Sequence, residues 1–132
     1  MIFVDTSFLV AGVIERDRHH EAAKRLMPQV AGRRLVTTNH VRGETWTWIR
    51  RRAWHGKAVE MLDNLGSPTG YLQVVGVDQE VEEEALRWLR HHDEREYSFV
   101  DATSFAYMRA RGIQEALAFD GDFATAGFTE LR

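Results

Sequence analysis

The segment Met1–Ser7, with the sequence MIFVDTS, decides the fold class. Its apolar, β-branched and aromatic residues predict a short buried strand over residues 1–5. A strand without a polar face is typical of a parallel sheet that helices cover on both sides. Asp5 ends this strand and is followed by the apolar residues 8–10, so its surroundings should be largely buried. The chain therefore begins as an α/β domain with an acid at the edge of its sheet.

The rest of the chain alternates between predicted strands and helices. Short apolar runs predict strands at residues 34–37, 71–77, 116–119 and 127–131. Apolar spacing and capping residues predict helices over residues 15–27, 39–54 and 57–65, after Asp78, and from Ser98 to Gly112. Pro28 should end the first of these helices, and Asn39 is the expected N-cap of the second. Such alternation favours a mostly parallel sheet covered on both faces.

Length and composition exclude several classes of protein. A chain of 132 residues suits one domain spanning residues 1–132. Cysteine is absent, which excludes disulfides, thiolate metal sites and a catalytic thiol. The apolar opening is interrupted at Asp5, is far shorter than a membrane helix and has no basic region before it. We expect a cytoplasmic protein that does not bind membranes.

Charge is unevenly distributed along the chain. The formal net charge is −3, but residues 33–57 carry seven basic side chains and one acidic one. Residues 78–101 carry nine acidic and three basic side chains. This asymmetry indicates polyanion contact by one face, or else two solvated helix faces.

A few acidic residues stand at unusual places. Asp5 and Asp120 follow predicted strands and Asp101 begins a predicted helix, so all three should meet at one edge of a parallel sheet. Carboxylates that converge there repel one another strongly unless a cation joins them, and oxygen ligands favour Mg²⁺ or Mn²⁺ over zinc. Each acid alone also has an ordinary explanation. These are an N-cap at Asp5 for a helix starting at Thr6 or Ser7, a surface pair of Glu44 with Arg42 or Arg51, a capping box at Asp101, and a turn at Asp120 and Asp122.

Four motifs occur in a recognisable order. They are MIFVDTS at residues 1–7, TTN at residues 37–39 leading to Glu44, SFVD at residues 98–101, and FDGDF at residues 119–123. Asp5, Glu44, Asp101 and Asp120 are separated by 39, 57 and 19 residues. Across nearly its whole length the chain resembles a PIN-domain ribonuclease, most closely a VapC-type toxin of a toxin–antitoxin pair.

The resemblance implies an α/β/α sandwich with a parallel sheet of four or five strands. It also implies endonucleolytic cleavage of RNA that depends on Mg²⁺ or Mn²⁺. Asp5 and Asp101 would be the central metal ligands, Glu44 and Asp120 would complete the acidic pocket, and the hydroxyl of Thr6 would orient it. Asp122 occupies a position that varies in the family, so its role stays open. A homodimer and a small cognate antitoxin are the expected partners.

Arginines of the basic segment are candidates for binding the RNA backbone. Arg42, Arg50 and Arg51 would contact phosphates without reading sequence. Consecutive helical residues point about 100° apart, so at most two of the arginines at residues 50–52 can face the same RNA strand. The tryptophans, at residues 46, 48, 54 and 88, would either stack bases or pack in the core or at an interface.

Two other functions fit parts of the pattern. A non-catalytic PIN-like module would bind RNA or a partner without cutting. A metal phosphatase or a receiver-type aspartate pocket would act on small phosphorylated compounds. Only ten residues follow Asp122, and the only lysines are Lys24 and Lys57, which disfavours the phosphatase and receiver hypotheses.

Overall fold

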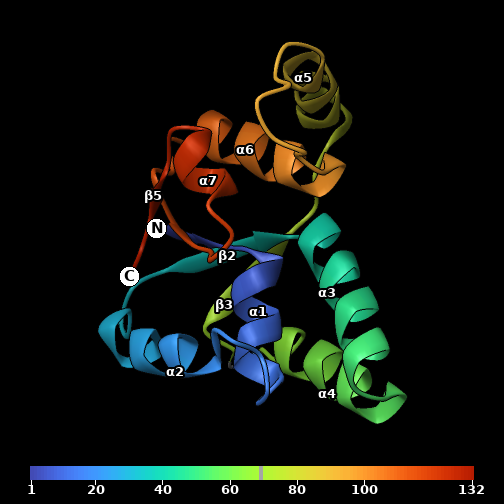
Figure 1. The fold of residues 1–132 in the computed structure, drawn as a ribbon, viewed down its shortest axis with the longest axis vertical. Helices are drawn as coiled ribbons and strands as arrows, with labels where there is room; N and C mark the ends of the chain where they lie inside the picture. The colour runs from blue at the N-terminus through green and yellow to red at the C-terminus, as the bar shows by residue number, and fades with distance from the viewer. Residues whose placement is uncertain (69) are drawn as a thin grey trace.

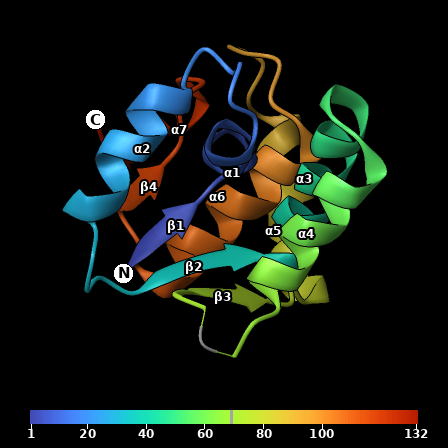
Figure 2. The ribbon, with the colours of Figure 1, turned by 90° about the horizontal axis from the view of Figure 1, so that it is seen from below.

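Five parallel strands form the centre of the molecule in a computed structural model that describes residues 1–68 and 70–132. The strand order is β3-β2-β1-β4-β5, and every neighbouring pair is parallel. The strands are β1 (Ile2–Val4), β2 (Leu35–Thr38), β3 (Leu72–Val75), β4 (Glu115–Leu117) and β5 (Thr129–Glu130). The predicted parallel sheet is confirmed, and Figure 2 shows β1, β2 and β3 running side by side.

Helices connect the strands and cover both faces of the sheet. Along the described chain they are α1 (Thr6–Val13), α2 (His20–Gln29), α3 (Asn39–Arg52), α4 (His55–Leu65), α5 (Gln79–Arg90), α6 (Phe99–Arg111) and α7 (Asp122–Thr125). In Figure 1, α6 and α7 lie above the sheet, whereas α1, α2 and α4 lie below it. The expected α/β/α sandwich is therefore confirmed. None of the described helices is long and apolar enough to cross a membrane.

Alternating side chains of the central strand build the two cores. Ile2 and Val4 pack with Phe8 of α1 and Leu26 of α2 on one face. Phe3 points to the other face, where α6 and α7 contribute a cluster that includes Phe105, Phe123 and Met108. All three residues of β1 are fully buried, which explains why this strand has no polar face. The carboxyl end of β1 is thereby fixed from both sides.

The first helical region differs most from the sequence prediction. A helix was expected over residues 15–27, but the chain forms α1 at residues 6–13, turns, and begins α2 at His20. Asp17 stabilises the turn by accepting a hydrogen bond from the backbone N–H of His19 at 2.9 Å. Pro28 lies inside the last turn of α2 and does not end the helix before it.

Smaller corrections concern caps and strand ends. The N-cap of α3 is Thr38, one residue before the predicted Asn39, because the Thr38 hydroxyl accepts from the backbone N–H of Val41 at 3.2 Å. Asn39 instead accepts from the backbone N–H of Val77 at 2.9 Å. Strand β4 ends at Leu117, two residues before the predicted end, and α7 takes the place of the simple turn expected at Asp122. The predicted caps at Asp78 and Ser98 are confirmed.

Two glycines in open surroundings allow a test of backbone conformation. Gly112 ends α6 with φ of 67°, whereas Gly43 lies inside α3, and a Cβ atom would meet nothing within 4 Å at either position. We expect Gly112→Ala to lower the free energy of unfolding by roughly 1–2 kcal/mol because alanine is strained at positive φ. Gly43→Ala should raise it by roughly 0.5–1 kcal/mol because alanine favours a helix interior. Urea unfolding of both variants measures the two changes in the free energy of unfolding. Changes of the same sign would contradict the backbone conformations assigned to Gly112 and Gly43.

Candidate active site

Asp5 joins the central strand to α1. Its Oδ2 accepts hydrogen bonds from the backbone N–H of Ser7 at 3.1 Å and from the Ser7 hydroxyl at 2.7 Å, so Asp5 is the N-cap of α1. Ser7 Oγ also accepts from the backbone N–H of Phe119 at 3.1 Å, which ties the capped turn to the segment after β4. Both hydrogen bonds to the Asp5 side chain end on Oδ2. Oδ1 is therefore left for another ligand.

Asp101 is held by the start of α6. Ser98 and Asp101 form a reciprocal capping box, in which Asp101 Oδ2 accepts from the backbone N–H of Ser98 at 3.0 Å and Ser98 Oγ accepts from that of Asp101 at 2.9 Å. The Asp101 side chain thus has a fixed direction, and its Oδ1 has no such partner in the described chain.

The turn between β4 and α7 contributes two more carboxylates. Asp120 Oδ1 accepts from the backbone N–H of Asp122 at 3.1 Å, and Asp122 Oδ1 accepts from Arg95 Nε at 2.6 Å. Arg95 Nη2 also donates to the backbone carbonyl of Asp120 at 3.0 Å. Arg95 therefore fastens the loop before α6 to this turn, and one oxygen of each aspartate remains available.

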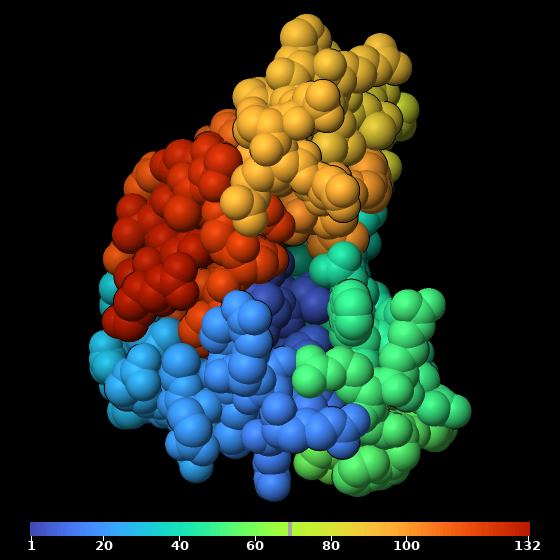
Figure 3. All heavy atoms as spheres, viewed as in Figure 1, coloured from blue at the N-terminus to red at the C-terminus, as the bar shows by residue number. Residues whose placement is uncertain are grey.

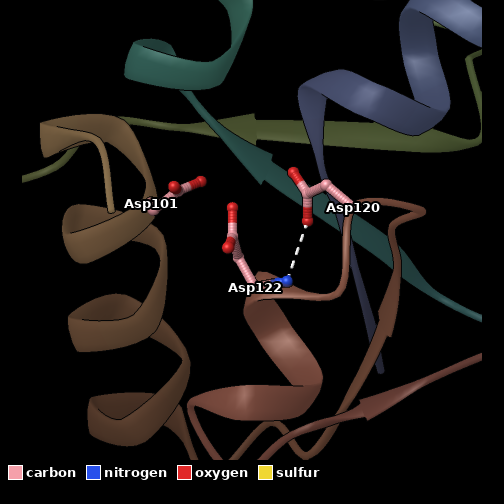
Figure 4. A group of neighbouring side chains, drawn as sticks. All are labelled: Asp101, Asp120 and Asp122. Atoms are coloured by element: carbon pink, nitrogen blue, oxygen red, sulfur yellow. Dashed lines mark hydrogen bonds between the residues drawn. The ribbon is translucent and has the colours of Figure 1, made fainter. Parts of the chain in front are cut away.

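Three of these carboxylates converge at one point. Asp101, Asp120 and Asp122 each offer an oxygen, and these oxygens all lie within 4.8 Å of one another. Figure 4 shows the three side chains pointing together from α6, from the loop after β4 and from the start of α7. The possible participation of Asp122, left open by the sequence, thus has a geometric basis.

Asp5 and Glu44 lie beside this group in a hollow of about 300 Å³. Asp120, Thr6 and Ser98 line the same hollow. Figure 3 shows it near the middle of one face, with dark blue atoms of the N-terminal segment at its floor. The predicted meeting of strand ends and a helix start at one edge of the sheet is what forms this hollow.

Burial and mutual repulsion make these carboxylates weak acids. Desolvation, with repulsion from Asp120 and Asp101, raises the pKa of Asp5 to about 8. Desolvation also raises the pKa of Asp101 to about 7, with repulsion from Asp120 added. The pKa of Asp120 is raised by burial as well. Several negative charges in such surroundings favour a bound cation or bound protons.

Glu44 extends into the same hollow from α3. Burial raises the pKa of its side chain, and the nearby hydroxyl of Thr6 opposes that rise. Thr6 Oγ1 is buried, and no partner reaches hydrogen-bond geometry with it in the described part of the chain. An unsatisfied buried hydroxyl costs free energy, so this oxygen is suited to a water or ion that the protein does not itself supply.

The donor set fits a hard divalent cation. Asp5, Asp101 and Asp120 each use one carboxylate oxygen for a structural hydrogen bond and have a second oxygen without one among the described residues. The cluster of Asp101, Asp120 and Asp122 offers oxygen ligands, which matches the preference of Mg²⁺ and Mn²⁺.

The structure separates the arginines that the sequence grouped together. Arg42, Arg50 and Arg51 are all exposed. Arg51 lines a second hollow beside Glu44, whereas Arg42 and Arg50 line neither of these two hollows. Arg52 lines the acidic hollow and pairs with Asp17, with 2.6 Å between Nη1 and Oδ2. Arg51 and Arg52 thus line different hollows, and the limit of two arginines facing one RNA strand stays a prediction.

Several site residues escaped the sequence analysis. Asp17 and His19 line the acidic hollow from the turn between α1 and α2, a region predicted as helix. Arg95 contacts Asp122, which lies 27 positions away in the sequence, and no local pattern predicts such a contact. Ser7 was visible in the opening motif as a possible helix start, but its bridge to Phe119 depends on tertiary structure.

Comparison with known proteins agrees with this geometry. The model of the PIN domain family matches residues 2–129. The chain belongs to the PIN-domain family. The family resemblance inferred from the four motifs is thereby confirmed, and the phosphatase and receiver hypotheses are not supported.

Close relatives cover the full length of this PIN-domain protein. It is 53% identical over 135 residues to proteins named 23S rRNA-specific endonuclease VapC20 from two strains of Mycobacterium tuberculosis, CDC 1551 and H37Rv. The alignment covers 100% of this chain and 98% of each relative. The crystal structure of Mycobacterium tuberculosis VapC20, described as a sarcin-ricin loop cleaving toxin, superposes with a TM-score of 0.94 at 51% identity, covering 100% of this chain and 99% of that one.

The raised carboxylate pKa values predict an unusual dependence of stability on pH. Between the ordinary pKa of 3.8 and the folded value of about 8, folded Asp5 binds more protons than unfolded Asp5, so this residue destabilises the metal-free fold increasingly as pH rises through that window. Asp5→Asn keeps the capping oxygen and removes the charge. We expect the variant to melt at least roughly 4 °C above the unsubstituted protein near pH 8 in chelator, with the difference vanishing near pH 4.

At high pH, Mg²⁺ should raise the melting temperature of the unsubstituted protein above that of Asp5→Asn, because it stabilises the protein that retains the carboxylate. Asp63→Asn, a change at an exposed position on α4, is the matched control and should leave the pH profile unchanged. A profile for Asp5→Asn that parallels the parent at all pH values would contradict the assigned burial of charge.

Proposed function

We propose that this PIN-domain protein is a toxin that cleaves RNA as a divalent-cation-dependent endoribonuclease. The observation that carries the proposal is a set of three carboxylates at the edge of a PIN-domain sheet, each with one oxygen held by a hydrogen bond. Asp5 and Asp101 are buried, and Asp120 is exposed. Asp5 and Asp101 are the central ligands, with Glu44 and Asp120 completing the set. Asp122 is a further candidate ligand, since one of its oxygens lies within 4.8 Å of those of Asp101 and Asp120.

The residues of the chain supply position and charge. A bound Mg²⁺ or Mn²⁺ ion would polarise a phosphate oxygen of RNA and lower the pKa of a water molecule. Glu44 or Asp120 would orient that water, because both line the hollow from different sides. Thr6 would hold a second water through its otherwise unsatisfied hydroxyl. Arg51 would bind a neighbouring phosphate, with Arg42 and Arg50, which precede it on α3, as weaker contacts.

The relatives favour ribosomal RNA as the substrate. Proteins sharing about half of their residues with this chain are named for 23S rRNA cleavage, and one is described by its action on the sarcin-ricin loop. We extend that substrate to this chain. A small cognate antitoxin, a homodimer and action in the cytoplasm, where ribosomes are found, remain part of the proposal as implications of the family resemblance.

The first test is cleavage of ribosomal RNA by purified protein freed of antitoxin. With Mg²⁺ or Mn²⁺ we expect discrete fragments whose ends map to one loop of 23S rRNA, and with chelator none. Asp101→Asn keeps the capping oxygen of α6 but removes a ligand charge worth several kcal/mol in the transition state, so its rate should fall by about 100-fold or more. Primer extension and single-turnover rates measure both effects.

Asp63→Asn serves again as the control, at an exposed position outside the site. Fragments that persist in chelator, or an Asp101→Asn rate within a few-fold of the parent, would overturn the proposed site. A folded protein that binds RNA but never cuts it would support the non-catalytic module instead.

The proposed backbone contact predicts a difference between neighbouring arginines. Arg51 lines the hollow beside Glu44, whereas Arg50 is exposed outside it. We expect Arg51→Ala to weaken RNA binding and to make the negative slope of log K against log salt less steep by about one. Arg50→Ala should change that slope less. Salt titrations with the Asp101→Asn background measure both, and identical slopes would contradict the placement of Arg51.

A further inference from the structure

One tryptophan occupies a different setting from the other three. Trp46 packs edge-on against His55, and Trp88 lies among aromatic side chains in the core beside α6. Trp54 is 62% exposed, but the Nζ atom of Lys57 lies over its ring at 5.9 Å. Trp48 is 47% exposed and has no aromatic pair, cation–π contact or hydrogen bond within the described residues. The contacts of the fold therefore leave its ring open.

Trp48 stands directly beside the acidic site. It follows Glu44 by four residues on α3, and residues at this spacing share a helix face. Both side chains line the hollow of about 300 Å³ that contains Asp5 and Asp120. Trp54 does not line it, and neither do Trp46 and Trp88.

The same two residues also border a second hollow. Glu44 and Trp48, together with His40 and Arg51, line a space of about 530 Å³. Trp48 therefore forms part of a ridge shared by two adjoining hollows. One hollow is acidic, and the other contains the guanidinium of Arg51, which has no ion-pair partner among the described residues. Both hollows have the volume of small-ligand sites.

This arrangement matches the chemistry of a nucleotide chain. A phosphate on the acidic side would meet the cation, a phosphate on the other side would meet Arg51, and the base between them would lie against the indole. Aromatic side chains in single-strand binding sites stack on bases of any identity, because every base has a π-face. Bases inside a duplex are already stacked and do not offer that face.

We propose that Trp48 is a stacking platform for the nucleobase next to the scissile phosphate, which restricts cleavage to unpaired nucleotides. The proposal rests on the proposed RNA-cleaving function and adds a determinant of substrate choice to it. Arg51 holds the phosphate on the far side of this base. Trp48 thus selects for exposed bases without selecting their sequence.

The test compares Trp48→Ala, Trp48→Phe and the matched control Trp54→Ala. The substrate is a synthetic RNA hairpin carrying the sarcin-ricin loop sequence, made with and without a base at the nucleotide flanking the cleavage position. On the intact hairpin, Trp48→Ala should lower kcat/KM by about 10-fold or more, Trp48→Phe should restore most of it, and Trp54→Ala should have no effect. On the abasic hairpin, Trp48→Ala should cleave as well as the parent.

Binding gives an independent measurement. In the Asp101→Asn background, Trp48→Ala should weaken binding to single-stranded poly(A) about 10-fold and leave binding to poly(A)·poly(U) duplex unchanged. In protein that retains Asp101, the Mg²⁺-induced rise in melting temperature should be the same with and without the Trp48→Ala change, which separates stacking from damage to the cation site.

The outcomes distinguish the two proposals. If the parent protein cleaves the hairpin and Trp48→Ala cleaves it equally well, the stacking proposal is wrong and the proposed function stands. If Trp48→Ala loses the same factor on the abasic hairpin, the ring acts by shaping the site and the proposal is again wrong. If the parent cuts no RNA, the proposed function fails, and the poly(A) titration alone decides whether the ring binds bases.

Discussion

Asp5 is 2% exposed at the end of the central strand, and desolvation, together with repulsion from carboxylates of other segments, raises the pKa of its side chain to about 8. Negative charge held this close in a poorly solvated place is stable only with a proton or a cation. The surrounding structure is organised to tolerate it. Hydrogen bonds from Ser7 hold one oxygen of Asp5, and equivalent bonds hold Asp101 and Asp120, so the other oxygens keep fixed directions. A cation entering the site would find its ligands already oriented, at little cost in reorganisation.

Structural and chemical roles are combined in the same side chains. From sequence, Asp5 and Asp101 each had two explanations, a helix cap or a place in an acidic pocket. The structure gives both residues the cap. It also places Asp5 in the lining of the hollow and brings an oxygen of Asp101 within 4.8 Å of oxygens of Asp120 and Asp122. The two roles are compatible because a carboxylate has two oxygens and a cap needs only one. A side chain that must cap a helix also loses the freedom to swing away from its neighbours, which is an advantage for a site built from mutually repelling groups.

Much of the sheet and part of the site could be predicted from local patterns. The strand at the start of the chain, the caps at Asp78 and Ser98, and the position of Asp101 follow from short-range chemistry. The convergence of Asp5, Asp101 and Asp120 follows from the geometry of parallel sheets. Contacts such as Arg95 with Asp122 and Ser7 with Phe119 depend on how loops pack against each other, and no periodicity encodes them. The turn at residues 14–19 was missed because its polar residues fit a helix pattern as well as a turn, and only Asp17 reveals the difference once its hydrogen bond is seen.

The placement of α3 and α5 distributes charge unevenly along the long axis of the molecule. Arg50, Arg51 and Arg52 form the last turn of α3, whereas α5 carries acidic residues from its first turn onward. In Figure 1, α5 lies at one extreme of the long axis, and the last turn of α3 lies toward the other. A polyanion diffusing nearby is repelled from the first end and drawn to the second, so it tends to arrive along α3 before any base is examined. This guidance works over roughly the 10 Å screening length of 0.1 M salt and shortens as salt increases. The charge distribution along the long axis therefore sets the direction from which a polyanion approaches. The hollow beside Asp5 then acts on a polyanion that is already aligned with α3.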